Sequence, residues 1–405
     1  MLPLQLLVDA RLVTAEHASR VVAPAYDALD AAGRRQHIAT NPESFLAALP
    51  TGGAPSTGFG TQRRALHRLH ERGRFRALPG PALLVLELTE GATSITTVVV
   101  DVDVEAFLDG RIRPHEHVRA DRVAELAGYL TEVRAASSPV CVLHRRHPDL
   151  DAVVAEVQEQ DVDLDAALTA QDRVRVWVVT EPATRRRLAR AAAEVEDATV
   201  ADGHHRAAAV ARRVGPDAVH AAHRPGVAGP VPLEQHRLVL TALVAGDDLQ
   251  IAAFHRRIDG LGPVTVDEVR AVLHRVGLTT RPLPGPALPA TAGTVHLAVA
   301  GSWLSVDIHG ERGDSLRDRL DVAIAERHVV APLATLADGP HPAEIVPVPG
   351  PAGLAALQRE DSVGVALVPP TLGQILAITS AGGVLPHKST YLRPKLRSGI
   401  LTVPR

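Results

Sequence analysis

The sequence has one cysteine, few aromatic residues and little net charge, and each scarcity removes a class of function. Cys141 is the only cysteine, which excludes an intrachain disulfide framework and a zinc or iron–sulfur site built from several cysteines. Aromatic residues make up 2% of the chain, so platforms for stacking single-stranded nucleic acid are scarce. The net charge of −3 gives no field for binding nucleic acid or an anionic membrane. We therefore expect no nucleic acid and no membrane among the partners.

Long apolar runs and a recognisable export signal are also missing. The apolar start at 1–9 has no basic residue before it and soon reaches Asp9, unlike a signal peptide. No stretch approaches the length of a membrane span. The apolar run at 139–143 around Cys141 is typical of a buried structural thiol in a reducing compartment. These features predict a cytoplasmic protein.

Three common nucleotide and hydrolase motifs are absent. The sequence contains no GxxxxGK[ST] phosphate loop, no GxGxxG dinucleotide fingerprint and no GxSxG nucleophile elbow. A nucleotide site in this chain must therefore be of a less common kind.

The length and the hydrophobic pattern predict a mixed α/β fold in two domains. A chain of 405 residues can bury two or three cores. Strand-like and helix-like segments occur in both halves, and the chain becomes richer in strands after residue 231. We place the boundary near 245–262, which gives an N-terminal α/β domain at 1–245 and a strand-rich α/β domain at 246–405. Segment 384–396 of the second domain is expected to return to the site of the first.

Apolar runs predict strands at 82–88, 94–102, 139–143, 173–180, 198–201, 237–245, 250–258, 294–300, 303–308 and 362–368. Amphipathic segments predict helices at 62–76, 123–136, 183–196, 204–214, 266–276 and 315–327. A further strand at 21–23 is expected to enter a proline loop that presents Tyr26 and Asp27. Proline-rich loops are predicted at 281–291 and 339–351.

The densest polar motif follows the apolar run at 198–201. It reads Asp202-Gly203-His204-His205-Arg206. Gly203 can take the positive φ of a tight turn, and Asp202 can cap the helix that follows. Free N–H groups at a helix N-terminus beside Arg206 favour an anion. The alternative is an ordinary capped helix whose two histidines lie on the surface.

Two other polar clusters share this mixture of cations, imidazoles and carboxylates, at 113–122 and 387–395. Arginine forks and lysine ammonium groups suit phosphate oxygens. Glu116, between two histidines, can act as a general base on a hydroxyl. Phosphoryl transfer needs little beyond positioning, charge neutralisation and such a base. Mg²⁺ would be the usual partner, with Asp202 or Asp27 supplying a carboxylate.

A transition-metal site is the competing interpretation. His115 and His117 would point to the same face if they lay in a strand, and His204 or His205 could complete a histidine set for a metal-dependent hydrolase. Neither spacing matches an established zinc signature. A solvated loop is the simpler alternative for the pair at 115 and 117.

Five ordered motifs resemble the large bacterial and archaeal family known as domain of unknown function 1015. The motifs are Ala23-Pro24-Ala25-Tyr26-Asp27, Asn41-Pro42-Glu43-Ser44-Phe45, Arg113-Pro114-His115-Glu116, Ala201 to Arg206, and Lys388-Ser389-Thr390-Tyr391 with Pro394-Lys395-Leu396. The resemblance spans about residues 20 to 400. The element at 202–206 is in turn similar to ParB-like domains, a group that includes CTP-binding partition proteins and free-serine kinases. This second resemblance implies a ParB-like nucleotide-binding core in which 202–206 contacts a phosphate.

The sequence departs from the family pattern at positions where aromatic residues or a proline are frequent. Ala207 follows the arginine of the motif, His387 stands at a common proline position, and Leu392 and Arg393 replace aromatics. These departures put base stacking at those positions in doubt.

The motifs and the resemblance together predict a nucleotide-dependent phosphotransferase acting on the hydroxyl of a small molecule such as free serine, with ATP or ADP and Mg²⁺ as cofactors. Glu116 and His205 are the expected catalytic residues, Tyr26 and Asp27 are expected to bind substrate, and Asp202 to hold the metal. The expected phosphate-binding residues are Arg113, His115, Asp202, Gly203, His204, Arg206, Lys388, Ser389, Thr390 and Lys395. A non-catalytic CTP- or ATP-binding switch is the alternative that needs no base.

Overall fold

The computed structural model describes residues 1–25, 28–50, 58–215, 233–308, 313–337, 341–350 and 353–405. The chain divides into two compact units. Unit 1 contains Met1–Leu249 and Pro394–Arg405, and unit 2 contains Gln250–Arg393. No helix in the described ranges is long and apolar enough to cross a membrane.

Unit 1 is built around an eight-stranded mixed sheet with the order β10-β7-β11-β5-β4-β9-β8, in which β1 also pairs with β5. Its strands are β1 (Leu4–Gln5), β4 (Leu83–Glu90), β5 (Thr93–Asp103), β7 (Val140–His144), β8 (Leu164–Ala167), β9 (Asp172–Val179), β10 (Thr199–Asp202) and β11 (Leu238–Ala245). Consecutive valines 98–100 of β5 are all buried, because this central strand is covered on both faces.

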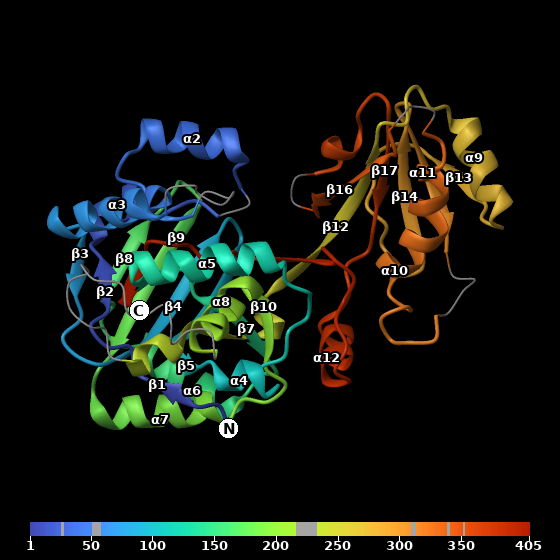
Figure 1. The fold of residues 1–405 in the computed structure, drawn as a ribbon. Coiled ribbons are helices and arrows are strands. Elements are labelled where there is room, and N and C mark those ends of the chain that lie inside the picture. The colour runs from blue at the N-terminus through green and yellow to red at the C-terminus, as the bar shows by residue number, and fades with distance from the viewer. Residues whose placement is uncertain (26–27, 51–57, 216–232, 309–312, 338–340, 351–352) are drawn as a thin grey trace. The chain divides into compact units, whose positions relative to one another are not determined.

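Helices surround this sheet (Figure 1). They are α1 (Ala18–Val21), α2 (Ala31–Thr40), α3 (Gly60–Glu71), α4 (Glu105–Leu108), α5 (Ala120–Val133), α6 (Pro148–Gln158), α7 (Pro182–Ala193) and α8 (His204–Val214). Helix α8 contacts β7 and β11, and α5 packs along α8. Both helices carry small buried side chains, Ala127 on α5 and Ala207 on α8, which favour close helix packing.

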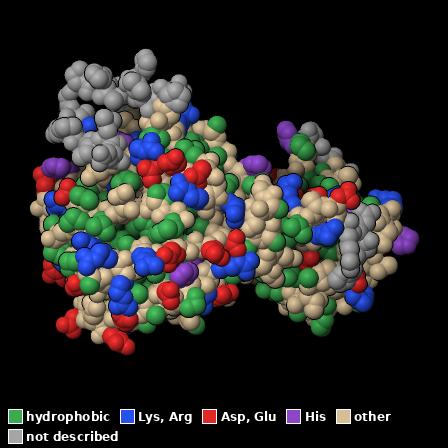
Figure 2. Space-filling view, turned by 90° about the horizontal axis from the view of Figure 1, so that it is seen from below, with side chains coloured by type: hydrophobic (Ala, Val, Ile, Leu, Met, Phe, Trp, Pro, Cys, Tyr) green, Lys and Arg blue, Asp and Glu red, His purple; other side chains and the backbone are tan. Residues whose placement is uncertain are grey.

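A smaller sheet joins the two ends of unit 1, with the order β3-β2-β19-β6. Its strands are β2 (Arg11–Val13), β3 (Phe75–Ala77), β6 (Ala135–Ala136) and β19 (Leu401–Pro404). Strand β19 pairs with β2 on one side and β6 on the other, so the last residues complete unit 1. On the face seen in Figure 2, acidic and basic side chains alternate without a large patch of one sign, as the small net charge leads us to expect.

Unit 2 has a seven-stranded sheet with the order β13-β15-β14-β17-β12-β16, in which β18 also pairs with β12. The strands are β12 (Gln250–Asp259), β13 (Thr280–Leu283), β14 (Thr294–Val299), β15 (Ser302–Asp307), β16 (Glu344–Pro349), β17 (Ser362–Ala366) and β18 (Thr390–Arg393). Its helices are α9 (Val266–Arg275), α10 (Asp321–Ala325), α11 (Ala331–Ala334) and α12 (Leu372–Ser380). These helices pack with the sheet in a core that includes the strand residues Ile258, Leu297 and Val365, and a smaller cluster forms around Trp303 and Leu357.

The mixed α/β class is confirmed, and several local predictions are wrong. The loop predicted at 281–291 begins inside the edge strand β13, and the helix predicted at 62–76 ends at Glu71, before β3. No strand forms at 21–23, because the N–H of Val22 donates to Ala18 and that of Ala23 to Ser398 rather than to a ladder. The helix predicted at 315–327 begins at Asp321 and continues as a π-helix over Glu326–Val330. The proline-rich loop at 339–351 contains β16, whose prolines are tolerated because β16 is an edge strand.

Candidate functional site

The turn between β10 and α8 depends on Gly203. This residue is the N-cap of α8 and has a φ of 96°, in the left-handed region that side chains rarely adopt. A Cβ here would lie 2.6 Å from Nη2 of Arg206, so the guanidinium packs directly on the glycine. The predicted strand, turn and helix are confirmed. The cap expected from Asp202 is wrong, because Gly203 occupies the N-cap position and the Asp202 carboxylate is engaged elsewhere.

Two cations hold the Asp202 carboxylate. Its Oδ2 accepts a hydrogen bond from Nη2 of Arg206 at 2.7 Å, and its Oδ1 lies 3.4 Å from Nζ of Lys395. The same Nη2 donates to the carbonyl oxygen of Pro139. Burial opposes ionisation, but the charges of Lys395 and Arg206 outweigh it and hold the pKa of the Asp202 carboxyl well below its usual range. Asp202 is therefore ionised at neutral pH.

The segment 113–119 is hydrogen-bonded to the β10–α8 junction. The N–H of Arg113 donates to Ala198, and the carbonyl of Arg113 accepts from Val200. Further along, the N–H of His115 donates to Nε2 of His204 at 3.1 Å, and the N–H of Arg119 donates to Nε2 of His205 at 3.0 Å. Both histidines of the motif thus anchor this segment to the start of α8.

These hydrogen bonds fix the proton on His204. Because Nε2 accepts, the proton of the neutral ring lies on Nδ1, and this nitrogen is 3.5 Å from Oε1 of Glu116. The His115 ring packs edge-to-face against the His204 ring, with their centroids 4.5 Å apart, and Nδ1 of His115 donates to the carbonyl of Val200. Glu116 is thereby placed beside a buried imidazole with a defined tautomer.

Burial keeps both rings uncharged. It lowers the pKa of His115, against the attraction of the Glu116 and Asp202 charges. It also lowers the pKa of His204 well below the ordinary value, and His115 adds to the effect. The contacts of His115 and Arg119 with His204 and His205, and of Lys395 with Asp202, bring segments 113–119, 202–206 and 394–396 into one cluster.

Cys141 lies beside this cluster and confirms the buried thiol predicted from its apolar run. It pairs with Asp202 across β7 and β10, next to a register shift between Val200 and Asp202. Burial, helped by the negative charge of Asp202, raises the pKa of the thiol to about 12. A thiol in this state is not a nucleophile at neutral pH.

The other predicted site residues lie in different places. Lys388, Ser389 and Thr390 belong to unit 2, where Nζ of Lys388 lies over the ring of Phe254 and the Ser389 hydroxyl donates to Pro386. Their convergence on Gly203 stays a prediction. The pair predicted to bind substrate, Tyr26 and Asp27, lies outside the described residues.

The histidine pair at 115 and 117 does not lie in a strand, so the shared face assumed for a metal site is wrong. The chain there is irregular because its N–H groups bond to the histidines of α8. Within the described ranges, no group of three or more His, Cys, Asp or Glu side chains could hold a metal ion.

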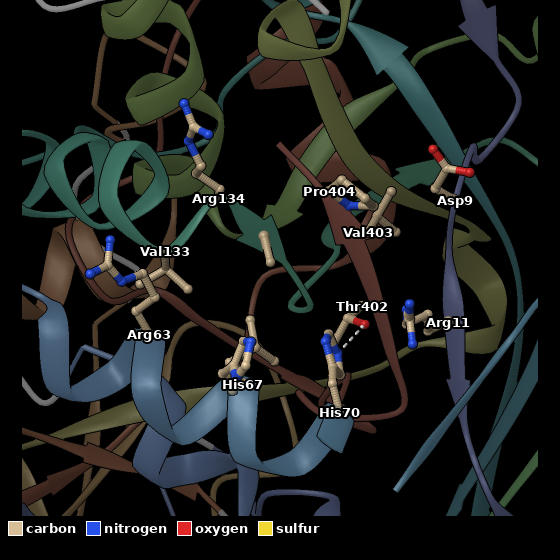
Figure 3. Close-up of a pocket in the computed structure, with 12 residues that line it drawn as sticks. Asp9, Arg11, Arg63, His67, His70, Val133, Arg134, Thr402, Val403 and Pro404 are labelled. Carbon is tan, nitrogen blue, oxygen red and sulfur yellow. Dashed lines mark hydrogen bonds between the residues drawn. The ribbon is translucent and has the colours of Figure 1, made fainter. Parts of the chain in front are cut away.

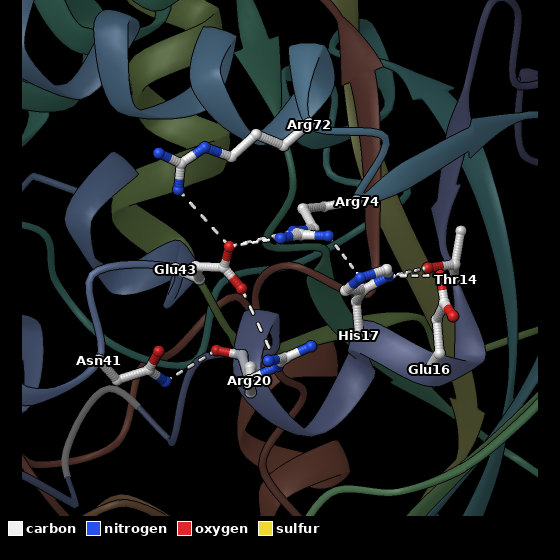
Figure 4. A network of polar contacts seen from close by, with 8 residues as sticks. All are labelled: Thr14, Glu16, His17, Arg20, Asn41, Glu43, Arg72 and Arg74. Carbon is white, nitrogen blue, oxygen red and sulfur yellow. Dashed lines mark hydrogen bonds and ion pairs between the residues drawn. The ribbon is translucent and has the colours of Figure 1, made fainter.

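The sequence did not single out Glu43 of the motif at 41–45, yet it gathers a network of three arginines (Figure 4). Its Oε1 accepts from Nε and Nη2 of Arg74 and lies 3.5 Å from Nη1 of Arg72, while Oε2 is 3.9 Å from Arg20. The hydrogen bonds from Arg74 lower the pKa of Glu43 despite its burial. Arg20 comes from α1, and Arg72 and Arg74 come from the connection between α3 and β3, so spacing around Glu43 could not have revealed this network.

Comparison with known proteins identifies the family of this chain. A family described as Protein of unknown function (DUF1015) matches over residues 7–323. The chain belongs to this family. The resemblance to this family is thereby confirmed over the first four motifs, while the fifth, at 388–396, lies beyond the matched residues. No curated protein matches the chain.

The solved structures that match this DUF1015 member have low sequence identity and low structural similarity to it. A free serine kinase in complex with AMP is 12% identical, with a TM-score of 0.35, covering 78% of this chain and 94% of its own. SbnI with C-terminal truncation from Staphylococcus aureus is 12% identical, with a TM-score of 0.38, covering 76% and 87%. A conserved hypothetical protein from Pyrococcus furiosus is 11% identical, with a TM-score of 0.33, covering 78% and 97%. Similarity at this level carries no argument about activity, so the site is interpreted from its own geometry.

Proposed function

We propose that the β10–α8 junction is the site of a nucleotide-dependent phosphotransferase that acts on the hydroxyl of a small molecule such as free serine. One observation carries the proposal. The Glu116 carboxylate lies beside the buried neutral His204, in the same cluster as the cations Arg206 and Lys395. A base, two cations and a helix N-terminus are the parts that phosphoryl transfer requires.

Phosphate binding would use the start of α8. The positive end of its dipole would attract an anion at the Gly203 turn, although the N–H of Arg206 already donates to the carbonyl of Gly203. Lys395 lies near the same turn, with its Nζ 3.4 Å from Oδ1 of Asp202. Its ammonium would contact a phosphate oxygen, and Arg206, which bonds Asp202 through Nη2, would add charge-assisted contacts from the rest of its guanidinium.

Glu116 would remove the proton from the acceptor hydroxyl. The hydroxyl oxygen then forms a bond to the terminal phosphorus, the bond from phosphorus to the bridging oxygen breaks, and the nucleotide leaves with that electron pair. His204 orients Glu116 through its Nδ1, and His205 holds the segment 113–119 through the Arg119 N–H. Both imidazoles are thus positioning groups in this proposal.

One carboxylate of this site, that of Asp202, is suited to coordinate Mg²⁺. Asp202 is kept ionised, and Mg²⁺ commonly takes one or two protein carboxylates with phosphate oxygens and water. Bound in this way, Mg²⁺ would neutralise charge on the phosphates. Asp202 would hold it, and Lys395 would be the cation displaced toward the nucleotide.

Phosphorus NMR of the full chain mixed with Mg²⁺, ATP or ADP, and free serine tests the proposal. We expect a new phosphomonoester signal, formed at least ~10²-fold more slowly by Glu116→Gln because the base is lost. Glu105→Gln is the matched control, since it removes an exposed carboxylate from α4. Turnover that Glu116→Gln leaves unchanged would refute the role of the base, and absence of nucleotide binding at millimolar concentration would refute the site.

The same experiment distinguishes a phosphotransferase from a non-catalytic nucleotide-binding switch. A switch needs the phosphate site and no base, so nucleotide would bind equally to the native chain and to Glu116→Gln, and neither would yield product. Product formation by the native chain removes this alternative.

A further inference from the structure

A second polar site lies in unit 1, at the opposite end of α5 from the β10–α8 junction. It is a pocket of about 260 Å³ between α3, β2, β19 and the end of α5 (Figure 3). Arg119, the N-cap of α5, contacts His205, whereas Arg134, the C-cap, lines the pocket. A helix of this length separates its two ends by roughly 20 Å. The pocket is therefore distinct from the junction.

Basic side chains from three elements surround this pocket. Arg63, His67 and His70 project from α3, Arg11 comes from β2, and Arg134 ends α5 (Figure 3). Asp9 is the one acidic side chain among its lining residues. Within the described ranges, Arg11 and Arg63 form no ion pair with a carboxylate, unlike many arginines on this chain. The pocket thus carries an excess of positive charge.

His70 lies beside these cations. Burial, together with the charges of Arg11 and His67, lowers the pKa of His70 to about 4. Its Nε2 lies 3.2 Å from the Thr402 hydroxyl. The two side chains add neutral hydrogen-bonding groups to the cationic lining.

The backbone holds one of these arginines in a costly conformation. Arg134 has a φ of 59°, in the left-handed region, which costs a non-glycine residue about 1 kcal/mol or more. Its N–H donates to Leu130, and its carbonyl accepts from Arg405 at 2.9 Å. The pairing of β6 with β19 maintains this turn and keeps Arg134 at the pocket.

We propose that this pocket binds a small phosphate monoester, at a site separate from the β10–α8 junction. A dianion matches the excess of guanidinium groups, whose forks bind phosphate oxygens in pairs. The volume is below that of an ordinary cofactor cleft, so the organic part of the ligand is short and a nucleotide is too large. Apolar side chains of Leu66, Val133 and Val403 would contact that organic part.

Calorimetry with inorganic phosphate and with glycerol 3-phosphate, on the full chain, tests the site. We expect both to bind, the ester more tightly, and Arg11→Ala and Arg63→Ala each to weaken binding by about tenfold, because each removes charge-assisted hydrogen bonds. Arg68→Ala is the matched control, since Arg68 lies on α3 and does not line the pocket. Equal affinities in all three variants would overturn the proposal.

A second measurement keeps the test decisive if a variant folds poorly. The imidazole carbon-bound protons of His70 in the native chain should shift on adding phosphate, and the pKa of His70 should rise because a nearby anion favours its charged form. An excess of ADP should leave this response unchanged. A response abolished by ADP, or by Arg206→Gln, would mean that phosphate binds at the junction and that the pocket is no separate site.

Discussion

Cations at the two ends of α5 meet opposite conditions. At the N-terminal end, Arg206 and Lys395 both face the Asp202 carboxylate, and burial lowers the pKa of the neighbouring His115 and His204 rings. At the C-terminal end, Arg11 and Arg63 line a pocket without a carboxylate partner among the described residues.

This difference determines whether an anion can bind without breaking an existing ion pair. The junction is balanced within the chain, so a ligand there must exchange with contacts that already exist, such as the one from Lys395. The pocket is unbalanced, so an anion there relieves repulsion without breaking an ion pair. Charge changes should therefore have opposite effects at the two ends.

The largest effect is expected at a buried ion pair near the pocket. Arg405 follows β19 and its N–H donates to the carbonyl of Arg134, while its buried guanidinium pairs with the buried carboxylate of Asp101. Asp101→Asn leaves that charge unpaired, and we expect the free energy of unfolding to fall by about 3–5 kcal/mol in guanidinium denaturation. Asp165→Asn, which breaks an exposed pair with Arg173, should cost less than about 1 kcal/mol. Equal losses would show that burial does not govern these pairs.

Gly203→Ala should have the next largest effect, because it strains the turn and displaces the Arg206 guanidinium from Asp202. We expect a loss of about 2–3 kcal/mol. Gly91→Ala is the matched control, with a φ of 60° and no atom within 4 Å of its Cβ, and should lose only about 1 kcal/mol. Chemical denaturation measures both. A loss no greater than that of the control would contradict the packing of Arg206 on this glycine.

The neutral histidines at the junction predict a pH dependence. Unfolding returns the pKa of His115 and His204 toward about 6.5, so the unfolded chain binds more protons as the pH falls below that value. Their contribution to stability is complete above pH 6.5 and decreases on acidification, by up to ~1.4 kcal/mol per pH unit for each ring. Denaturation between pH 7.5 and 5 should show this slope, and His204→Gln should reduce it. An unchanged slope in that variant would mean that His204 is not held neutral.

The smallest effect should have the opposite sign. Arg63→Ala relieves repulsion at the pocket and should raise the free energy of unfolding by about 0.5 kcal/mol or less. Lys395→Met at the junction should lower it by about 1 kcal/mol, since Asp202 loses one of its two cations. Denaturation in low salt resolves the pair of variants. Losses at both ends would refute the contrast between a balanced and an unbalanced region.

Much of the fold could be predicted from local patterns. The strands β4, β5 and β9 and helices α3, α5 and α8 follow their hydrophobic periodicity closely. The hydrophobic pattern does not predict helix α6, and the prolines of β16 favour a loop over a strand. An edge position cannot be recognised without knowing the order of the sheet.

The candidate site was predictable only in part. The positive φ of Gly203 follows from local chemistry, because a tight turn before a helix favours glycine. The tautomer of His204 does not, since it depends on an N–H donated from residue 115, far away in sequence. The excess charge of the basic pocket depends likewise on Arg11, Arg63 and Arg134, which only the folded chain brings together.

Nucleotide binding at the junction is the central claim, and titration calorimetry with ADP tests it most directly. The account predicts that the native chain binds ADP, that Arg206→Gln weakens binding by about tenfold or more through loss of charge-assisted contacts, and that Arg11→Ala leaves it unchanged. Binding that Arg11→Ala weakens and Arg206→Gln does not would place the nucleotide at the other end of α5 and contradict the account.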